Sequence, residues 1–325
     1  MLAFIGNFSQ SFILALLIWP FAAFMLTLPV LIIQYRKYNK LRFWQSVGTY
    51  LFILYALGLV SFTLYPMPDN PALYCQIHHL EPQLVPFQFI SDIIRDGSSA
   101  IMQVVMNVLF FLPLGVFLRI LFGWRMRWSL IIGFATSLFI ETAQLTGVFG
   151  IYPCSYRLFD VDDLIVNTIG AVVGYGLACF IPVRNIEKVQ KDAVTLQPGL
   201  VRLIVSFIVD MIVSFLVTVV ITLSAHLIFG REFGLGIRDF ISVLSFYIFI
   251  FVVPYLNGGR SVGSYFTRLT FDNKPRRLAR RTAYYLFRFL FLAALIFAPH
   301  GINLFIIFIT FILWRKKKKL PYQYL

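Results

Sequence analysis

The feature that most constrains this chain is a series of long apolar runs separated by short polar loops. A helix that crosses the hydrocarbon core of a bilayer needs about 20 consecutive apolar residues, and most of these runs are that long. Because backbone groups in lipid must be hydrogen-bonded within their own segment, such runs are predicted to be helical. Only 13% of the residues are charged, against roughly 25% in soluble domains. The sequence therefore predicts an all-α, polytopic helical bundle in a membrane.

Seven runs have the length of a single membrane segment: 9–33, 43–65, 101–121, 128–149, 163–181, 201–229 and 240–256. An eighth run, 283–314, holds Pro299, His300 and Gly301 at its middle. It forms either one long helix or a hairpin of two short helices. The turn-forming residues and the basic residues on both flanks favour the hairpin, which gives about nine segments.

The basic residues predict the orientation. With the N-terminus outside and the C-terminus in the cytoplasm, all 28 Lys and Arg except Arg95, Arg157, Arg231 and Arg238 lie on the cytoplasmic side. The net charge of +14 therefore marks loops that flank the membrane and indicates anionic lipid headgroups, and no nucleic acid, as partners. No basic segment precedes the first apolar run, so we expect no cleavable signal peptide.

A polar linker divides the chain into two predicted membrane domains. Residues 1–183 contain five runs, residues 184–198 form a cytoplasmic linker, and residues 199–325 contain the remaining runs. Residues 66–99 are the longest polar stretch of the first domain. Their apolar residues between 87 and 94 predict a short amphipathic piece at the membrane interface.

A group of polar residues lies in and beside the apolar runs of the first domain. An ionisable residue inside such a run is costly to insert and usually marks a functional site. Glu141 lies about 13 residues, or roughly 20 Å, from the cytoplasmic start of its helix, which places it in the outer half of the membrane. Other polar residues are expected at a similar depth or in the loop above it. The predicted ligand-binding residues are Asn107, Glu141, Gln144, Arg157, Asp160, Asp163 and Asn167.

Structural roles compete with this interpretation. Asp160 or Asp162 suits the N-cap of the following helix. Asn107 and Gln144 suit hydrogen bonds between helices. Glu141 is harder to explain in this way, because a buried carboxylate needs a partner. Arg157 is the nearest candidate for that partner.

The chain has three cysteines, in no metal-binding pattern. Cys75 and Cys154 lie in two loops on the same predicted side, so a disulfide between them remains open, since sequence does not show connectivity. Cys75, His78, His79 and Glu81 match no standard zinc spacing. We expect no metal and no cofactor.

The segments NVLFFLPLGVFL, ETAQ and RLFDVDDLIVNTIGAVVGYG resemble the VanZ-like family of bacterial membrane proteins. The resemblance extends through PMPDN and VPFQFI and covers about residues 45–181. It implies a multi-pass bacterial cell-membrane protein, in a family without a settled reaction whose founding member gives low-level resistance to the glycopeptide teicoplanin. The family's characteristic positions fall here on Asn107, Pro113, Gly115, Glu141, Gln144, Arg157, Asp160, Asp163, Asn167, Gly170 and Gly174.

Residues 199–320 resemble the RDD family of small membrane domains. The resemblance rests on Arg202 and Asp210 in VRLIVSFIVDMIVS and on GGRSVGSYFTRLTF from Gly258. Arg202 and Asp210 share one helical face, about 12 Å apart. In a structural role, Asp210 is a buried charge satisfied by a basic residue of the following stretch. The acidic residue expected near the end of the family pattern is replaced by the basic run 315–319.

The polar residues around Glu141 predict binding of an amphiphilic or lipid-linked molecule, such as a cell-wall precursor or a lipoglycopeptide. The resemblance to the VanZ-like family implies a cell-envelope protein that affects glycopeptide resistance. Two other classes stay open. The first is a membrane-embedded enzyme that acts on a lipid-anchored cell-wall component, with carboxylates as acid, base or metal ligands. The second is an ion or solute transporter that uses Glu141 and Asp210. No inverted repeat is evident to support transport.

Overall fold

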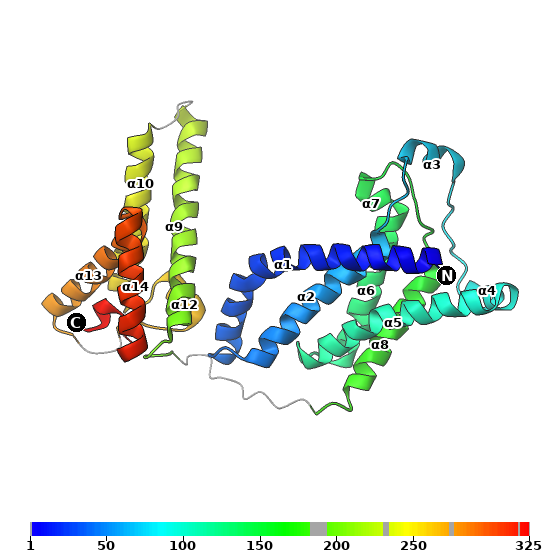
Figure 1. Cartoon of the computed structure of the whole chain (residues 1–325), viewed down its shortest axis with the longest axis horizontal. Coiled ribbons are helices and arrows are strands. Elements are labelled where there is room, and N and C mark those ends of the chain that lie inside the picture. Colours follow the sequence, from blue (N-terminus) through cyan, green and yellow to red (C-terminus); the bar gives the residue numbers. More distant parts are fainter. Residues whose placement is uncertain (1, 183–193, 230–233, 273–275, 318, 325) are drawn as a thin grey trace. The chain divides into compact units, whose positions relative to one another are not determined.

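The computed structural model describes residues 2–182, 194–229, 234–272, 276–317 and 319–324. Throughout these ranges the regular elements are helices, and no β-strand occurs (Figure 1). Within the described residues, seven helices are long and apolar enough to cross a membrane. The predicted all-α polytopic fold is confirmed, whereas the predicted count of about nine segments is not.

The chain divides into two compact units, which we describe separately. The first comprises Met1–Thr27 and Arg42–Ile186, and the second comprises Leu28–Leu41 and Glu187–Leu325. Helix α1 (Leu2–Tyr38) contributes residues to both units. Residues 183–193, which hold most of the predicted linker with Arg184, Lys188 and Lys191, lie outside the described residues. The predicted domain boundaries therefore stay a prediction.

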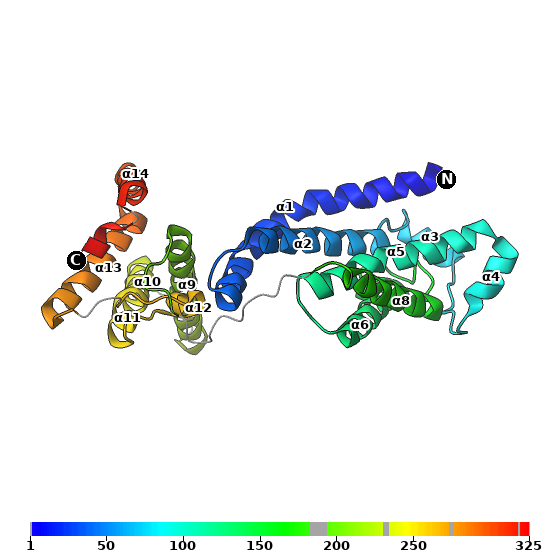
Figure 2. The same cartoon turned by 90° about the horizontal axis from the view of Figure 1, so that it is seen from below.

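Three helices form the centre of the first unit: α5 (Ser98–Ile120), α6 (Met126–Leu145) and α8 (Val161–Ala178). Helix α8 packs against both others, and α2 (Phe43–Leu64) covers α5 and α6 (Figures 1 and 2). Apolar side chains fill the space between these helices. The buried members of this core are Leu59, Phe111, Leu114, Leu118, Ile140 and Ala171.

Helices α5 and α8 lie unusually close because glycine occupies their contact positions. A Cβ atom on Gly174 would lie 1.9 Å from the carbonyl oxygen of Leu112, and one on Gly115 would lie 1.9 Å from that of Ala171. Gly170 is similarly close to the backbone of α5. Small residues of this kind let helix backbones approach each other in membranes.

The C-terminal end of α6 differs from the sequence prediction, which continued the apolar run to residue 149. The helix ends at Leu145, and Gly147 soon after it adopts a left-handed φ of 59°, which an α-helix does not contain. Only glycine fits this position, because a Cβ would lie 2.3 Å from the carbonyl oxygen of Tyr152. The short helix α7 (Gly147–Gly150) follows. The loop from α7 to α8 then carries Arg157 and Asp160 of the candidate site.

Two short helices lie in the loop between α2 and α5. Helix α3 (Pro71–Ile77) begins at the N-cap Asn70, whose side chain accepts a hydrogen bond from the N–H of Leu73. Helix α4 (Gln88–Asp96) exposes Ile90 and Ile94. The predicted amphipathic piece, residues 87–94, is therefore helical from Gln88 onwards.

The second unit is built around α9 (Leu200–Phe229), against which α10 (Leu235–Tyr247) and the short helix α12 (Val262–Thr267) pack. A π-helical segment, η1 (Ile248–Val252), and α11 (Val253–Leu256) continue from α10. Helices α13 (Leu278–Phe297) and α14 (His300–Lys317) lead to the short helix η2 (Pro321–Tyr324).

Helices α13 and α14 confirm that the run 283–314 is broken in the middle. Ala298 has an extended backbone, with a φ of −69° and a ψ of 150°. The following Pro299 disfavours a helical conformation at this residue, so α13 ends here. Neither helix is among the seven that could span a membrane, which accounts for the lower number of segments.

Replacing Gly174 by alanine is expected to destabilise the first unit, because the added methyl group would collide with the backbone of α5. Overpacking of this kind costs about 1–3 kcal/mol. Unfolding of the purified protein in detergent measures the effect. Gly176→Ala is the matched control, since no atom lies within 4 Å of the Cβ that it would add to the same helix. Equal stability of the two variants would contradict the proposed packing.

Candidate functional site

One face of α6 carries a stripe of small and polar residues that packs against α8. Ser129, Gly133, Ser137 and Glu141 follow one another at intervals of four, so they lie on the same side of the helix. The Ser129 hydroxyl donates to the carbonyl oxygen of Ala171 at 2.8 Å. This stripe directs Glu141 towards the start of α8.

Glu141 is almost completely buried, with 2% of its surface exposed. Its Oε2 atom accepts a hydrogen bond of 3.0 Å from the backbone N–H of Asp160. The carboxylate also interacts electrostatically with Asp160, Asp163 and Arg157. Within the described residues no ion pair joins it to Arg157, so the expected partner is replaced by a backbone donor.

Asn107, Asp163 and Asn167 form one connected network. The Asn107 amide donates to Oδ1 of Asp163 at 2.6 Å. Asn167 donates to the Ser137 hydroxyl at 2.9 Å, and this hydroxyl donates to the carbonyl oxygen of Asp163 at 3.3 Å. The network links α5, α6 and α8, and it brings together three of the predicted site residues.

Gln144 has the structural role that the sequence left open. Its amide donates to the carbonyl oxygen of Thr63 at 2.9 Å, near the end of α2. The backbone carbonyl oxygen of Gln144 accepts a 3.3 Å hydrogen bond from the Ser155 hydroxyl. With 6% of its surface exposed, Gln144 fastens α6 to α2 and to the loop above.

Asp160 is the N-cap of α8, so the capping role suggested for it is confirmed. Its Oδ1 atom accepts the N–H of Asp162 at 2.8 Å and the Gln83 amide at 3.3 Å. Backbone bonds from Gln83 N–H to Phe159 and from Val161 N–H to Gln83 hold the segment before α4 against this loop. Burial raises the pKa of the Asp160 carboxyl above its usual range.

Asp162 is the residue of this region that the predicted set omits. It is 3% exposed, and its two oxygens accept the backbone N–H groups of Phe87 at 2.6 Å and Phe89 at 2.8 Å. These donors lie at the start of α4, where unpaired N–H groups attract a carboxylate. The sequence shows an acidic residue at the start of α8. It does not show that this residue binds the N–H groups of Phe87 and Phe89, which lie far away in the chain.

Arg157 lies in the loop between α7 and α8, and burial lowers the pKa of its guanidinium. Its backbone carbonyl accepts the Ser155 hydroxyl at 2.7 Å. No carboxylate of the described residues pairs with its side chain within 4.0 Å. Arg157 therefore supplies a partly buried positive charge beside the carboxylates.

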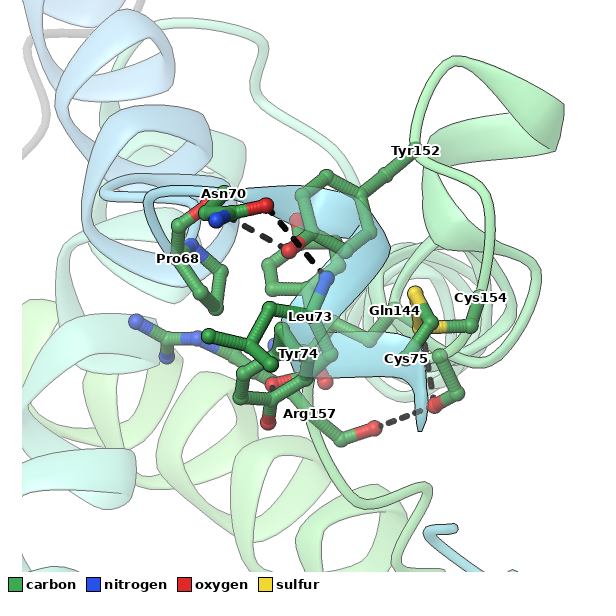
Figure 3. Close-up of a disulfide and its surroundings, with 11 residues drawn as sticks. Pro68, Asn70, Leu73, Tyr74, Cys75, Gln144, Tyr152, Cys154 and Arg157 are labelled. Atoms are coloured by element: carbon green, nitrogen blue, oxygen red, sulfur yellow. Dashed lines mark hydrogen bonds between the residues drawn. A yellow bond between two sulfur atoms is a disulfide. The ribbon is translucent and has the colours of Figure 1, made fainter. Parts of the chain in front are cut away.

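A disulfide between Cys75 and Cys154 answers the question that the sequence left open, and it fastens α3 to this loop (Figure 3). Tyrosine hydroxyls reinforce the attachment. Tyr74 donates to the carbonyl oxygen of Tyr156 at 3.2 Å, and Tyr152 donates to that of Pro68 at 3.3 Å. The loop above Glu141 is thus cross-linked to the segment that precedes α4.

In the second unit, Arg202 and Asp210 have separate partners. The Arg202 guanidinium hydrogen-bonds to Asn39 and Thr195 and lies 4.5 Å from the ring centre of Tyr35. Asp210 accepts the Ser261 hydroxyl and the N–H of Gly263, each at 2.7 Å. The hydrogen-bond donors to Asp210 therefore come from the start of α12, and Arg288 of the following basic stretch interacts with this carboxylate electrostatically.

The candidate site thus combines several polar groups. They are the carboxylates of Glu141, Asp160 and Asp163, the guanidinium of Arg157 and the amides of Asn107 and Asn167. Carboxylates accept hydrogen bonds from cationic or N–H and O–H groups, whereas a guanidinium binds anions. Among the described residues, no three His, Cys, Asp or Glu side chains are arranged to hold a metal ion. The arrangement suits recognition of a polar group that carries hydrogen-bond donors.

Comparison with known proteins gives one family match. Residues 52–182 match the VanZ/LLP1 family, a range that contains α5, α6, α8 and all seven predicted site residues. No curated protein and no solved structure matches the chain. The family match ends before α9, so the resemblance of residues 199–320 to the RDD family stays a prediction from sequence motifs.

Removal of the Asp162 carboxylate should release the start of α4. In Asp162→Ala the N–H groups of Phe87 and Phe89 lose their acceptor, and hydrogen bonds to charged groups are worth about 1.5–3 kcal/mol. Amide hydrogen exchange of residues 87–89 should therefore accelerate about tenfold or more. The control is Asp96→Ala at the exposed end of the same helix. A comparable acceleration of exchange at residues 87–89 in this control would contradict the role of the Asp162 carboxylate in holding the start of α4.

Proposed function

We propose that the first unit is part of a bacterial cell-envelope protein that binds the polar headgroup of an amphiphilic or lipid-linked molecule in the outer leaflet. In this proposal the bound molecule links the protein to susceptibility towards glycopeptides of the teicoplanin type. The observation that carries the proposal is the buried Glu141 carboxylate beneath the loop of residues 150–160.

Glu141 retains acceptor capacity that its surroundings do not use. A carboxylate accommodates about four hydrogen bonds, and within the described residues one donor, the Asp160 N–H, reaches it. Asp163, which interacts with Glu141, receives one side-chain donor from Asn107. Keeping two such carboxylates close together in an apolar span is costly unless a donor-rich group binds there.

The surroundings favour a ligand that approaches from the membrane. Ile90 is 52% exposed and Ile94 is 82% exposed on α4, the amphipathic helix that Asp162 holds beside the site. Helices of this kind lie in the interface with their apolar side in the lipid. An amphiphile whose chains lie in the bilayer would bring its headgroup to the same level as this helix.

The resistance role rests on the VanZ/LLP1 match, since the matched residues include the whole candidate site. Glycopeptides act on cell-wall precursors at the outer face of the membrane. A headgroup site on that face is therefore the simplest connection between the geometry and the family.

Neutralising the two carboxylates tests this proposal. Glu141→Gln and Asp163→Asn, separately and together, should restore teicoplanin susceptibility to that of cells without the protein, because the amides keep the shape and lose the charge. Asp96→Asn, at an exposed position on α4, should keep the wild-type phenotype. Protein abundance and the Cys75–Cys154 bond report folding of each variant. Unchanged susceptibility at normal abundance would refute the proposal.

The predicted orientation has its own test in the cysteines. A membrane-impermeant maleimide, added to intact cells after an impermeant reductant, should label Cys75 and Cys154, because both are expected outside. Cys179, which is free and exposed at the other end of α8, should be labelled only after lysis. Variants that keep a single cysteine identify the labelled position. Labelling of Cys179 in intact cells would reverse the orientation.

A further inference from the structure

We propose that the second unit binds one anionic phospholipid, with an acyl chain in an apolar cavity and the phosphate in an adjoining basic cavity. This inference is independent of the site around Glu141, because every residue that it uses belongs to the second unit. Two cavities that are both lined by Trp314 carry the argument.

The apolar cavity lies among α9, α13 and α14 and has a volume of about 340 Å³. Its wall is almost entirely aliphatic and aromatic, and it includes Leu203, Phe207, Leu295, Ile307 and Phe311. Arg288, which also borders it, is 1% exposed and has its guanidinium 3.7 Å from the ring centre of Phe271. The cavity therefore suits a hydrocarbon chain.

The basic cavity has a volume of about 450 Å³. It lies beside the N-terminal end of α13 and the C-terminal end of α14. Arg276, Lys317 and Lys319 line it, together with residues 196–199. Trp314 borders both cavities, so they adjoin at this side chain. Tryptophan is favoured at the boundary between headgroups and acyl chains because its ring is amphipathic.

The charges around Arg276 leave a net positive site. Arg276 lies 4.0 Å from Asp272, but the same carboxylate pairs with Arg281 at 2.9 Å, so one negative charge serves two guanidinium groups. The Arg276 side chain is 7% exposed and lies 4.1 Å from the ring centre of Tyr284. Within the described residues its Nε and Nη1 atoms lack hydrogen-bond partners.

An ordered guanidinium with unused donors is well suited to a phosphate group, which it binds through parallel hydrogen bonds. Exposed lysines beside it add long-range attraction for an anionic headgroup. A free phosphate would use the basic cavity alone, and a choline headgroup would bring a positive charge towards the lysines. An anionic phospholipid satisfies both cavities.

The test measures binding of phosphatidylglycerol, phosphatidylcholine and inorganic phosphate to the full-length protein in detergent, by native mass spectrometry and by thermal stabilisation. Phosphatidylglycerol should bind and stabilise, and the other two should not. The double variant Lys317→Gln/Lys319→Gln should weaken phosphatidylglycerol binding about 25-fold, because each lysine contributes a factor of about five to the affinity. Both lysines are exposed, so this variant should fold normally.

Two further variants make the test specific. Arg125→Gln with Arg127→Gln removes the same charge from exposed positions of the first unit and should leave binding unchanged. Ile307→Trp should fill the apolar cavity and reduce phosphatidylglycerol binding without changing the charge. Equal binding of phosphatidylcholine, stabilisation by phosphate alone, or normal binding by the double lysine variant would each overturn the proposal.

Discussion

The close approach of α5 and α8 is the interaction on which the first unit depends. Because Gly115, Gly170 and Gly174 leave no side chain between the two backbones, the helices approach closely enough for Asn107 to reach Asp163 at 2.6 Å. Without this approach, the polar residues of α5 and α8 would face separate partners. The glycines are therefore part of the candidate site, although none of them carries a functional group.

The same packing explains how a bilayer tolerates so many polar groups in one place. Each unpaired polar group in hydrocarbon costs several kcal/mol. Gln144 and Asn167 avoid this cost by bonding to a backbone carbonyl and to a hydroxyl of neighbouring helices. They act as fastenings between helices, so the ligand-binding interpretation now depends on Glu141, Asp163 and Arg157.

Features that depend on local chemistry were predictable from the sequence. The length of the apolar runs indicated the helical membrane fold, and Pro299 indicated the break between α13 and α14. Counting residues along the helices also predicted a similar membrane depth for Asn107, Glu141, Gln144 and Asn167. The contact between Asp162 and the Phe87 N–H was not predictable, since it joins positions 75 residues apart. Nothing in the local pattern of either segment specifies such a partner.

The buried aspartates show why a charge inside an apolar run is an incomplete sign of function. Asp162 accepts two backbone N–H groups at the start of α4, and Asp210 accepts a hydroxyl and an N–H at the start of α12. Both carboxylates therefore fasten a short helix to a long one, and each accepts two hydrogen bonds in doing so. Among the described residues, Glu141 receives a single hydrogen bond, from the N–H of Asp160, the N-cap residue of α8. Its structural role accounts least for the free-energy cost of burying a carboxylate, and it therefore stays the centre of the candidate site.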